Sequence, residues 1–155
     1  MKNLLVGVNS QGRSAIAEDV PIVTASVPDI PGIAVAHLFS TTHSPPPPRP
    51  AGNGDFVDLG LAPGLVRCMV VEHGAPGTYG PPNMTGQLHH ADVLYLVYVE
   101  RGSIELRLED DAKQLEPGDF VVIPGVDHAY TAGPEGCRLL VVEIGTPPPE
   151  SGRVV

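Results

Sequence analysis

The chain of 155 residues has no tryptophan, and about 5% of its residues are aromatic, so its core must be built mainly from valine, leucine and isoleucine. It has only two cysteines, Cys68 and Cys137, each in an apolar strand-like run. We expect two buried free thiols and no disulfide framework. No apolar run approaches the roughly 20 residues that span a bilayer, and the first residues lack a signal-peptide core. These absences predict a soluble, cytoplasmic protein.

Positive charge is also scarce. Nine lysines and arginines stand against 18 aspartates and glutamates, which gives a formal net charge of -9. An acidic surface repels phosphate backbones, and no basic cluster is present. We therefore expect a small-molecule partner, with no nucleic acid and no membrane.

Glycine and proline are abundant, with 18 of each, which favours short strands and tight turns over long helices. Runs rich in β-branched or alternating residues predict strands at 21–25, 33–39, 65–72, 94–100, 103–109, 119–124 and 137–144. A turn or two of helix is expected near 14–19. Many short strands predict an all-β sandwich or small barrel, and periodicity alone does not choose between the two.

The length fits one compact domain. We expect an N-terminal extension over 1–55 that contains strands and a connector with prolines at 45–50. A barrel would follow over 56–146, and a proline-rich tail over 147–155. The proline run favours polyproline II and cannot join a sheet ladder.

The segment PGDFVVIPGVDH, 117–128, resembles the second motif of the cupin superfamily. In that motif a glycine is followed by five residues, a proline, a glycine-containing turn and a histidine. Gly118, Pro124, Gly125 and His128 fill these positions, with a turn one residue tighter than usual. Ala132 stands where that family often has asparagine.

The first cupin motif, a histidine pair followed by a glutamate and a glycine, is degenerate here. Counting back from Gly102 puts Tyr95 at the glutamate position. Depending on the spacing, the retained histidine is His90 or His89. A resemblance to a branch of single-domain cupins favours His89.

The resemblance implies a cupin-type conical β-barrel, or double-stranded jelly roll, with a ligand pocket inside. Alternation then predicts a pocket lined by Val97, Val99, Leu106 and Val122, which would suit a largely apolar ligand. Cupins are commonly dimers. The run LYLVYVE, 94–100, is apolar on both faces, so one face would fill the barrel and the other could cover a partner subunit, which predicts a homodimer.

The doublet His89-His90 bears on metal binding. A site for iron, manganese or zinc needs three or more converging histidine or carboxylate side chains. Successive strand residues point to opposite faces, so one of the doublet faces inward unless a bulge re-aims the other. Metal ligands would then be His89 or His90, His128 and, as a substitute, His73. A tyrosine with a pKa of about 10 is a poor ligand, so we favour no cofactor.

Three functions remain open. The first is a metal-independent isomerase, cyclase or dehydratase acting on a carbonyl-bearing or polyphenolic substrate. His89 or His90 and His128 would act as acid and base, and Tyr95 would polarise the substrate oxygen. The second is a metal-dependent oxygenase or decarboxylase, and the third is a non-catalytic ligand-binding protein.

Overall fold

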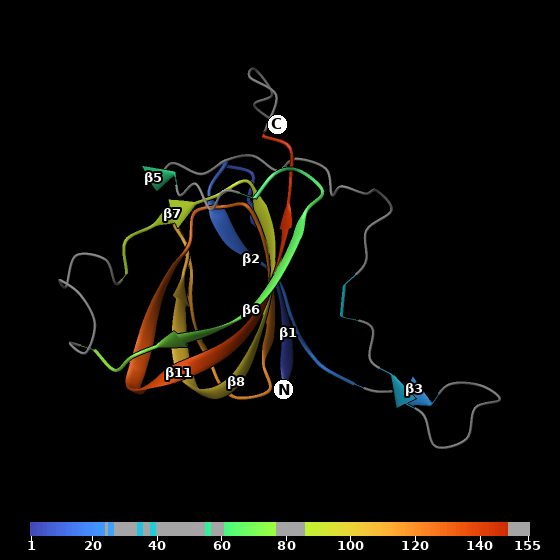
Figure 1. The fold of residues 1–155 in the computed structure, drawn as a ribbon, viewed down its shortest axis with the longest axis vertical. Coiled ribbons are helices and arrows are strands. Elements are labelled where there is room, and N and C mark those ends of the chain that lie inside the picture. Colours follow the sequence, from blue (N-terminus) through green and yellow to red (C-terminus); the bar gives the residue numbers. More distant parts are fainter. Residues whose placement is uncertain are drawn as a thin grey trace.

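The computed structural model describes residues 1–23, 25–26, 34–35, 38–39, 55–56, 61–76 and 86–148, and all their regular secondary structure is β (Figure 1). The strands are β1 (Lys2–Val8), β2 (Ser14–Pro21), β3 (Ala25–Ser26), β4 (Ala34–Val35), β5 (Asp55–Phe56), β6 (Val66–His73), β7 (His89–His90), β8 (Val93–Arg107), β9 (Ala112–Leu115), β10 (Phe120–Pro124) and β11 (Ala129–Gly145). Within these ranges, no helix has the length and apolar character to cross a membrane.

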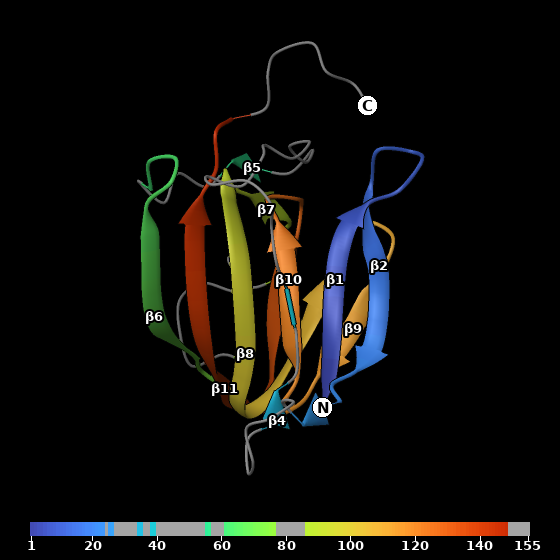
Figure 2. The same cartoon turned by 90° about the vertical axis from the view of Figure 1, so that its right-hand side faces the viewer.

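Seven strands form one mixed sheet. Its order is β2-β1-β10-β8-β11-β6, and β9 pairs with β8 off this path. Figure 2 shows the six strands of the path side by side, with β9 in the layer behind. The pairing of β1 with β10 is parallel, whereas β8 pairs antiparallel with β9, β10 and β11.

The two longest strands, β8 and β11, belong to both layers. They pair along almost their whole length, from Val93 opposite Gly145 to Arg107 opposite Ala129. The register shifts between Ala132 and Cys137, where both strands bend. Gly102 lies at this bend with a φ of 73°, a conformation that residues with a side chain rarely adopt. The expected all-β jelly roll is therefore confirmed.

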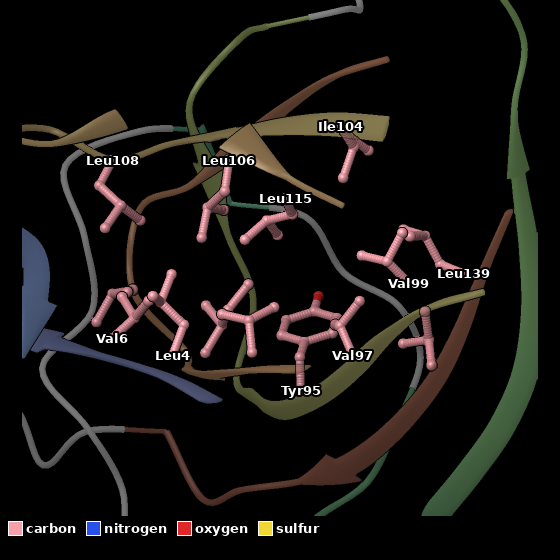
Figure 3. Close-up of a cluster of buried hydrophobic side chains, with 14 of the residues drawn as sticks. Leu4, Val6, Tyr95, Val97, Val99, Ile104, Leu106, Leu108, Leu115 and Leu139 are labelled. Carbon is pink, nitrogen blue, oxygen red and sulfur yellow. The ribbon is translucent and has the colours of Figure 1, made fainter. Parts of the chain in front are cut away.

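The core lies between the two layers. Figure 3 shows Tyr95, Val97 and Val99 on one side, facing branched aliphatic side chains that include Leu106 and Leu115 on the other. Val97, Val99 and Leu106 are each at most 1% exposed. Alternate residues of β8 fill the interior, as the sequence pattern predicts.

The N-terminal strands join the same sheet. The helical turn expected near 14–19 is wrong, because those residues form β2 and pair with β1. β1 was not predicted, although Leu4 and Val6 alternate with less buried neighbours and are each 1% exposed. The conformation of these N-terminal residues is set by the pairing of β1 with β10, which is distant in sequence, and not by their local preferences. The boundary at residue 55 stays a prediction.

Of the two thiols, Cys137 is buried as expected, whereas Cys68 is exposed. Cys68 pairs with Val142 in the register of β6 and β11, on the opposite face from the core residues Met69 and Val141. The expectation of burial is wrong there because β6 is the last strand of the sheet path and its outer face lies open. His37, His43, the prolines at 45–50 and residues 149–155 lie outside the described residues.

Candidate functional site

His89 and His128 are directly opposite each other. The backbone N–H of each donates to the carbonyl of the other, at 3.0 and 2.9 Å, as an isolated antiparallel bridge. Residues that exchange both backbone bonds have side chains on the same face. The two imidazole centroids accordingly lie 4.7 Å apart. His128, the last residue of the tight turn, thus contacts His89, the first residue of the histidine doublet.

Both rings of this pair have a fixed orientation. Nδ1 of His128 lies 2.8 Å from the carbonyl oxygen of Val126, and Nδ1 of His89 lies 3.1 Å from that of Gln87. A carbonyl only accepts, so each Nδ1 is the donor and Nε2 of the neutral ring is an acceptor. Burial is the main cause that lowers the pKa of His128 to about 4, so this ring is neutral at pH 7.

The turn that delivers His128 depends on Gly125. Its φ is 60°, and a Cβ at this position would lie 3.0 Å from the carbonyl oxygen of Ala91. The tighter spacing from Pro124 to His128 is therefore built on a close backbone approach that glycine allows. Figure 2 places β7 at the end of the sheet where β8 begins, next to this turn.

Tyr95 faces the interior beside His128. Their ring centroids are 5.3 Å apart in an edge-to-face arrangement, and Tyr95 is 8% exposed. Burial, and then the negative charge of Glu143, raise the pKa of Tyr95 well above its usual value. The phenol therefore stays protonated and can act as a hydrogen-bond donor. Tyr98, of opposite parity, is 38% exposed on the outer face.

His90 points elsewhere. Its Nδ1 lies 3.5 Å from an oxygen of Asp127, and both residues are buried. The doublet therefore diverges as strand geometry predicts, and His89 is the member that joins His128. The role of either histidine stays a prediction, and we assign it to His89 because the ring of His89 contacts that of His128.

Sequence reasoning missed a buried ion pair next to Tyr95. Glu143 is 2% exposed and pairs in register with both Tyr95 and Arg67. Nε and Nη2 of Arg67 lie 2.7 and 2.6 Å from the same Glu143 oxygen. The available signal was parity, since Glu143 follows the core residues Leu139 and Val141 at a spacing of two.

A second missed residue is Tyr130, two positions after His128. Its ring lies 5.6 Å from that of His128 and 5.8 Å from that of His73. His73 therefore approaches Tyr130, and burial lowers the pKa of His73. We name His89, His128, Tyr95, Tyr130 and His73 together the aromatic cluster.

The residues expected to line a pocket behave differently. Val97, Val99 and Leu106 belong to the packed core. Val122 is also buried but pairs with Leu96, whereas its neighbours Val121 and Ile123 face the core. The parity of Val122 was therefore assigned to the wrong face.

The described residues contain no group of three or more histidine, cysteine, aspartate or glutamate side chains placed to hold one metal ion. Of the four predicted ligands, the pair His89 and His128 comes together. His90 turns toward Asp127, and Tyr130 stands between His128 and His73. Two imidazoles do not make the three-donor set that these ions need.

Comparison with known proteins gives a family match. A model described as a cupin domain matches residues 71–143, which include the end of β6, the aromatic cluster and Glu143. No protein with curated function matches the chain.

Among solved structures, protein NMB1881 from Neisseria meningitidis is 16% identical with a TM-score of 0.40, over 52% of this chain and 74% of that one. KdgF from Halomonas sp. is 22% identical with a TM-score of 0.40, over 50% and 68%. The Cnp3 cupin domain of Schizosaccharomyces pombe is 15% identical with a TM-score of 0.39, over 94% and 83%.

Proposed function

We propose that the protein, which a cupin-domain model matches over residues 71–143, is a small-molecule enzyme that works by proton transfer inside its barrel. The observation that carries this proposal is the placement of His128, a neutral buried imidazole between His89 and Tyr95. The substrate would be a carbonyl-bearing or polyphenolic molecule, and the reaction an isomerisation, cyclisation or dehydration.

His128 has the role of general base in this proposal. Val126 holds the proton on Nδ1, so the Nε2 lone pair is available to take a proton from a carbon next to the substrate carbonyl. The C–H electron pair becomes a C=C bond as the carbonyl pair moves onto oxygen. The imidazolium then returns its proton to another carbon, which isomerises the substrate, or to a leaving hydroxyl, which departs as water.

Tyr95 has the role of hydrogen-bond donor to the substrate oxygen. Its raised pKa means that it stays protonated and stabilises the charge that develops on that oxygen. His89 supplies a second imidazole beside His128, and its Nε2 can relay the proton. His90 has no step in this scheme.

Proton exchange measures this function directly. Purified protein would be incubated in D₂O with small neutral hydroxyketones and phenols, and deuterium incorporation followed by NMR. We expect His128→Ala and Tyr95→Phe each to reduce the exchange rate about 100-fold or more. Tyr98→Phe, on the outer face, is the matched control and should keep the wild-type rate. Unchanged exchange in both site variants would refute the proposal.

A metal-dependent oxygenase or decarboxylase is the second candidate. One observation favours it: both imidazoles give Nδ1 to a backbone carbonyl, as metal-ligating histidines usually do. The donor set does not fit, since these two rings lack a third partner among the described residues. Elemental analysis after reloading with iron, manganese or zinc tests it. If the wild type binds one equivalent of metal and His128→Ala binds none, this second candidate would replace our first proposal.

A non-catalytic binding protein is the third candidate. The same arrangement of side chains could bind a ligand without reacting with it, because the fold alone does not determine function. A thermal-shift screen that finds ligands, together with no exchange or turnover of any of them, would establish this alternative.

We also propose that the protein is a homodimer through the outer face of β6, β11 and β8. Tyr98, Leu140 and Val70 lie side by side there in register, and each is between 38% and 49% exposed. Such a contiguous apolar surface on an otherwise acidic protein is typical of an interface. At one end of this surface Arg138 pairs with both Glu100 and Glu72. This end therefore presents positive and negative groups that a second copy could contact.

A further inference from the structure

Tyr130 carries a buried polar atom that the proposed chemistry does not use. Its hydroxyl is shielded from solvent and has no hydrogen-bond partner among the described residues. The great majority of buried side-chain polar atoms do have a partner, so each exception needs a physical explanation. A hydroxyl with no protein partner can be kept for one that a ligand brings.

The position of Tyr130 supports this explanation. It lies in β11 opposite Leu106, so it projects into the interior from the layer that faces Tyr95. His128 contacts both phenols edge-to-face, at 5.3 Å for Tyr95 and 5.6 Å for Tyr130. The base is thus flanked by two phenols that come from different layers of the barrel.

A cavity adjoins His73, the ring neighbour of Tyr130. His73, whose ring lies 5.8 Å from that of Tyr130, lines a space of about 410 Å³. The other lining residues are Glu72, Gly74, Arg101, Gly102, Glu135, Gly136 and Cys137, so its rim is charged. Ligand pockets of small-molecule proteins have about 300–1,000 Å³. Tyr130 contacts both His73, which lines this space, and His128, the proposed base, so its ring links the two.

The electrostatics of the interior indicate which molecule would bind. His128 is neutral, and burial raises the pKa of Tyr130 far above its usual value, so both phenols carry no charge. Two buried carboxylates near this site have partners: that of Glu143 pairs with Arg67, and that of Asp127 lies 3.5 Å from Nδ1 of His90. A charged ligand would lose its hydration here without gaining an opposite charge.

We propose that Tyr130 is a binding residue that donates its hydroxyl proton to a second oxygen of an uncharged substrate, whose first oxygen is held by Tyr95. This inference rests on the proposed function and deepens it by naming the substrate class: a small neutral molecule with two oxygen atoms on neighbouring carbons, such as a hydroxyketone or a catechol. His128 then lies beside the carbon skeleton that joins the two oxygens.

The test compares Tyr130→Phe with Tyr98→Phe, which removes a hydroxyl from the outer face. Binding of dihydroxyacetone and of catechol would be measured by calorimetry, with lactate as the anionic counterpart of similar size. We expect Tyr130→Phe to weaken binding of the neutral probes about tenfold, as for the loss of one hydrogen bond, and to raise KM more than it lowers kcat. Tyr98→Phe should bind as the wild type does.

Urea denaturation of the same variants separates a ligand-binding role from a structural one. Because the hydroxyl has no protein partner among the described residues, Tyr130→Phe should be at least as stable as the wild type. The inference is overturned if Tyr130→Phe is less stable, if its affinity is unchanged, if lactate binds more tightly than the neutral probes, or if neither neutral probe binds the wild type. Weaker binding in Tyr130→Phe together with normal proton exchange in His128→Ala would instead refute the catalytic function and leave the binding site standing.

Discussion

His89 and His128 exchange two backbone hydrogen bonds, and this pairing brings their imidazole rings to 4.7 Å. The relationship joins two stretches of sequence that are almost 40 positions apart. It also determines where the two side chains of the histidine doublet point. Because successive strand residues point to opposite faces, His90 lies on the other face, near Asp127. The position of the proposed base is set by backbone geometry and by the local carbonyl of Val126.

The buried His128 should make stability depend on pH. Its pKa is about 4 in the folded protein and 6.5 when unfolded. Between these values the unfolded chain binds a proton that the folded chain does not, so stability falls as pH falls from 6.5 toward 4 and is unaffected above that window. We expect the wild type to lose about 1.5 kcal/mol between pH 6.5 and pH 5 through this residue. Urea denaturation at several pH values measures it.

The matched variant for this measurement is His128→Gln, which cannot be protonated. The difference in unfolding free energy between the two proteins should change with pH by the stated amount, because other titrating groups contribute equally to both. Parallel pH profiles would show that His128 titrates normally in the folded state.

The ion pair of Arg67 and Glu143 should matter more than the surface pairs do. Arg67→Met leaves a carboxylate that is 2% exposed without this partner, which costs about 2–3 kcal/mol after allowance for the 39% exposure of the Arg67 side chain. The control is Arg101→Met, since Arg101 and Glu72 are mostly exposed and such pairs contribute about 0–1 kcal/mol. Chemical denaturation measures both. Equal losses in the two variants would contradict the burial argument.

The bend of β8 should not tolerate a side chain at Gly102. A Cβ there would lie 2.1 Å from the carbonyl oxygen of Gly136, and the φ of 73° adds backbone strain. We expect Gly102→Ala to lose about 3 kcal/mol or more. Gly7→Ala is the control, because its nearest neighbour would be Cβ of Ala17 at 3.6 Å, an ordinary contact. Thermal unfolding of both variants would be compared, and similar midpoints would contradict the prediction.

The sequence predicted the barrel strands well where alternation was clean. Tyr95, Val97 and Val99 face the core as expected, because parity along a single strand is a local property. Gly118, Pro124 and His128 also identified the turn of the second motif. These features depend on residues that are close together in sequence, so a sequence pattern can predict them.

The features that were missed depend on pairing between distant strands. β1 joins the sheet through β10, and the expected helical turn became β2 by pairing with β1. Which layer Val122 faces follows from its register with Leu96. Glu143 stands opposite Tyr95 and Arg67 for the same reason, so its partners could not be predicted from its own strand. The inward parity of a charged residue was the one signal available.

The apolar outer face predicts the oligomeric state. Leu140 lies at the centre of that face, between Val70 of β6 and Tyr98 of β8, and is 41% exposed. A carboxylate introduced there would be buried without a partner in a dimer, whereas in a monomer it would stay in water. We therefore expect the wild type to elute as a dimer in size-exclusion chromatography with light scattering, and Leu140→Glu to weaken dimerisation at least about 100-fold.

Val20→Glu is the control for this experiment. Val20 is 42% exposed, close to the 41% of Leu140, but it lies in β2 at the opposite end of the sheet path from β6. The same change in charge and size at this position should leave the dimer intact. A wild-type protein that is monomeric at micromolar concentration, or equal disruption by both variants, would rule out this face as the interface. In either result the rings of His89, Tyr95, His128 and Tyr130 would still come together within one chain.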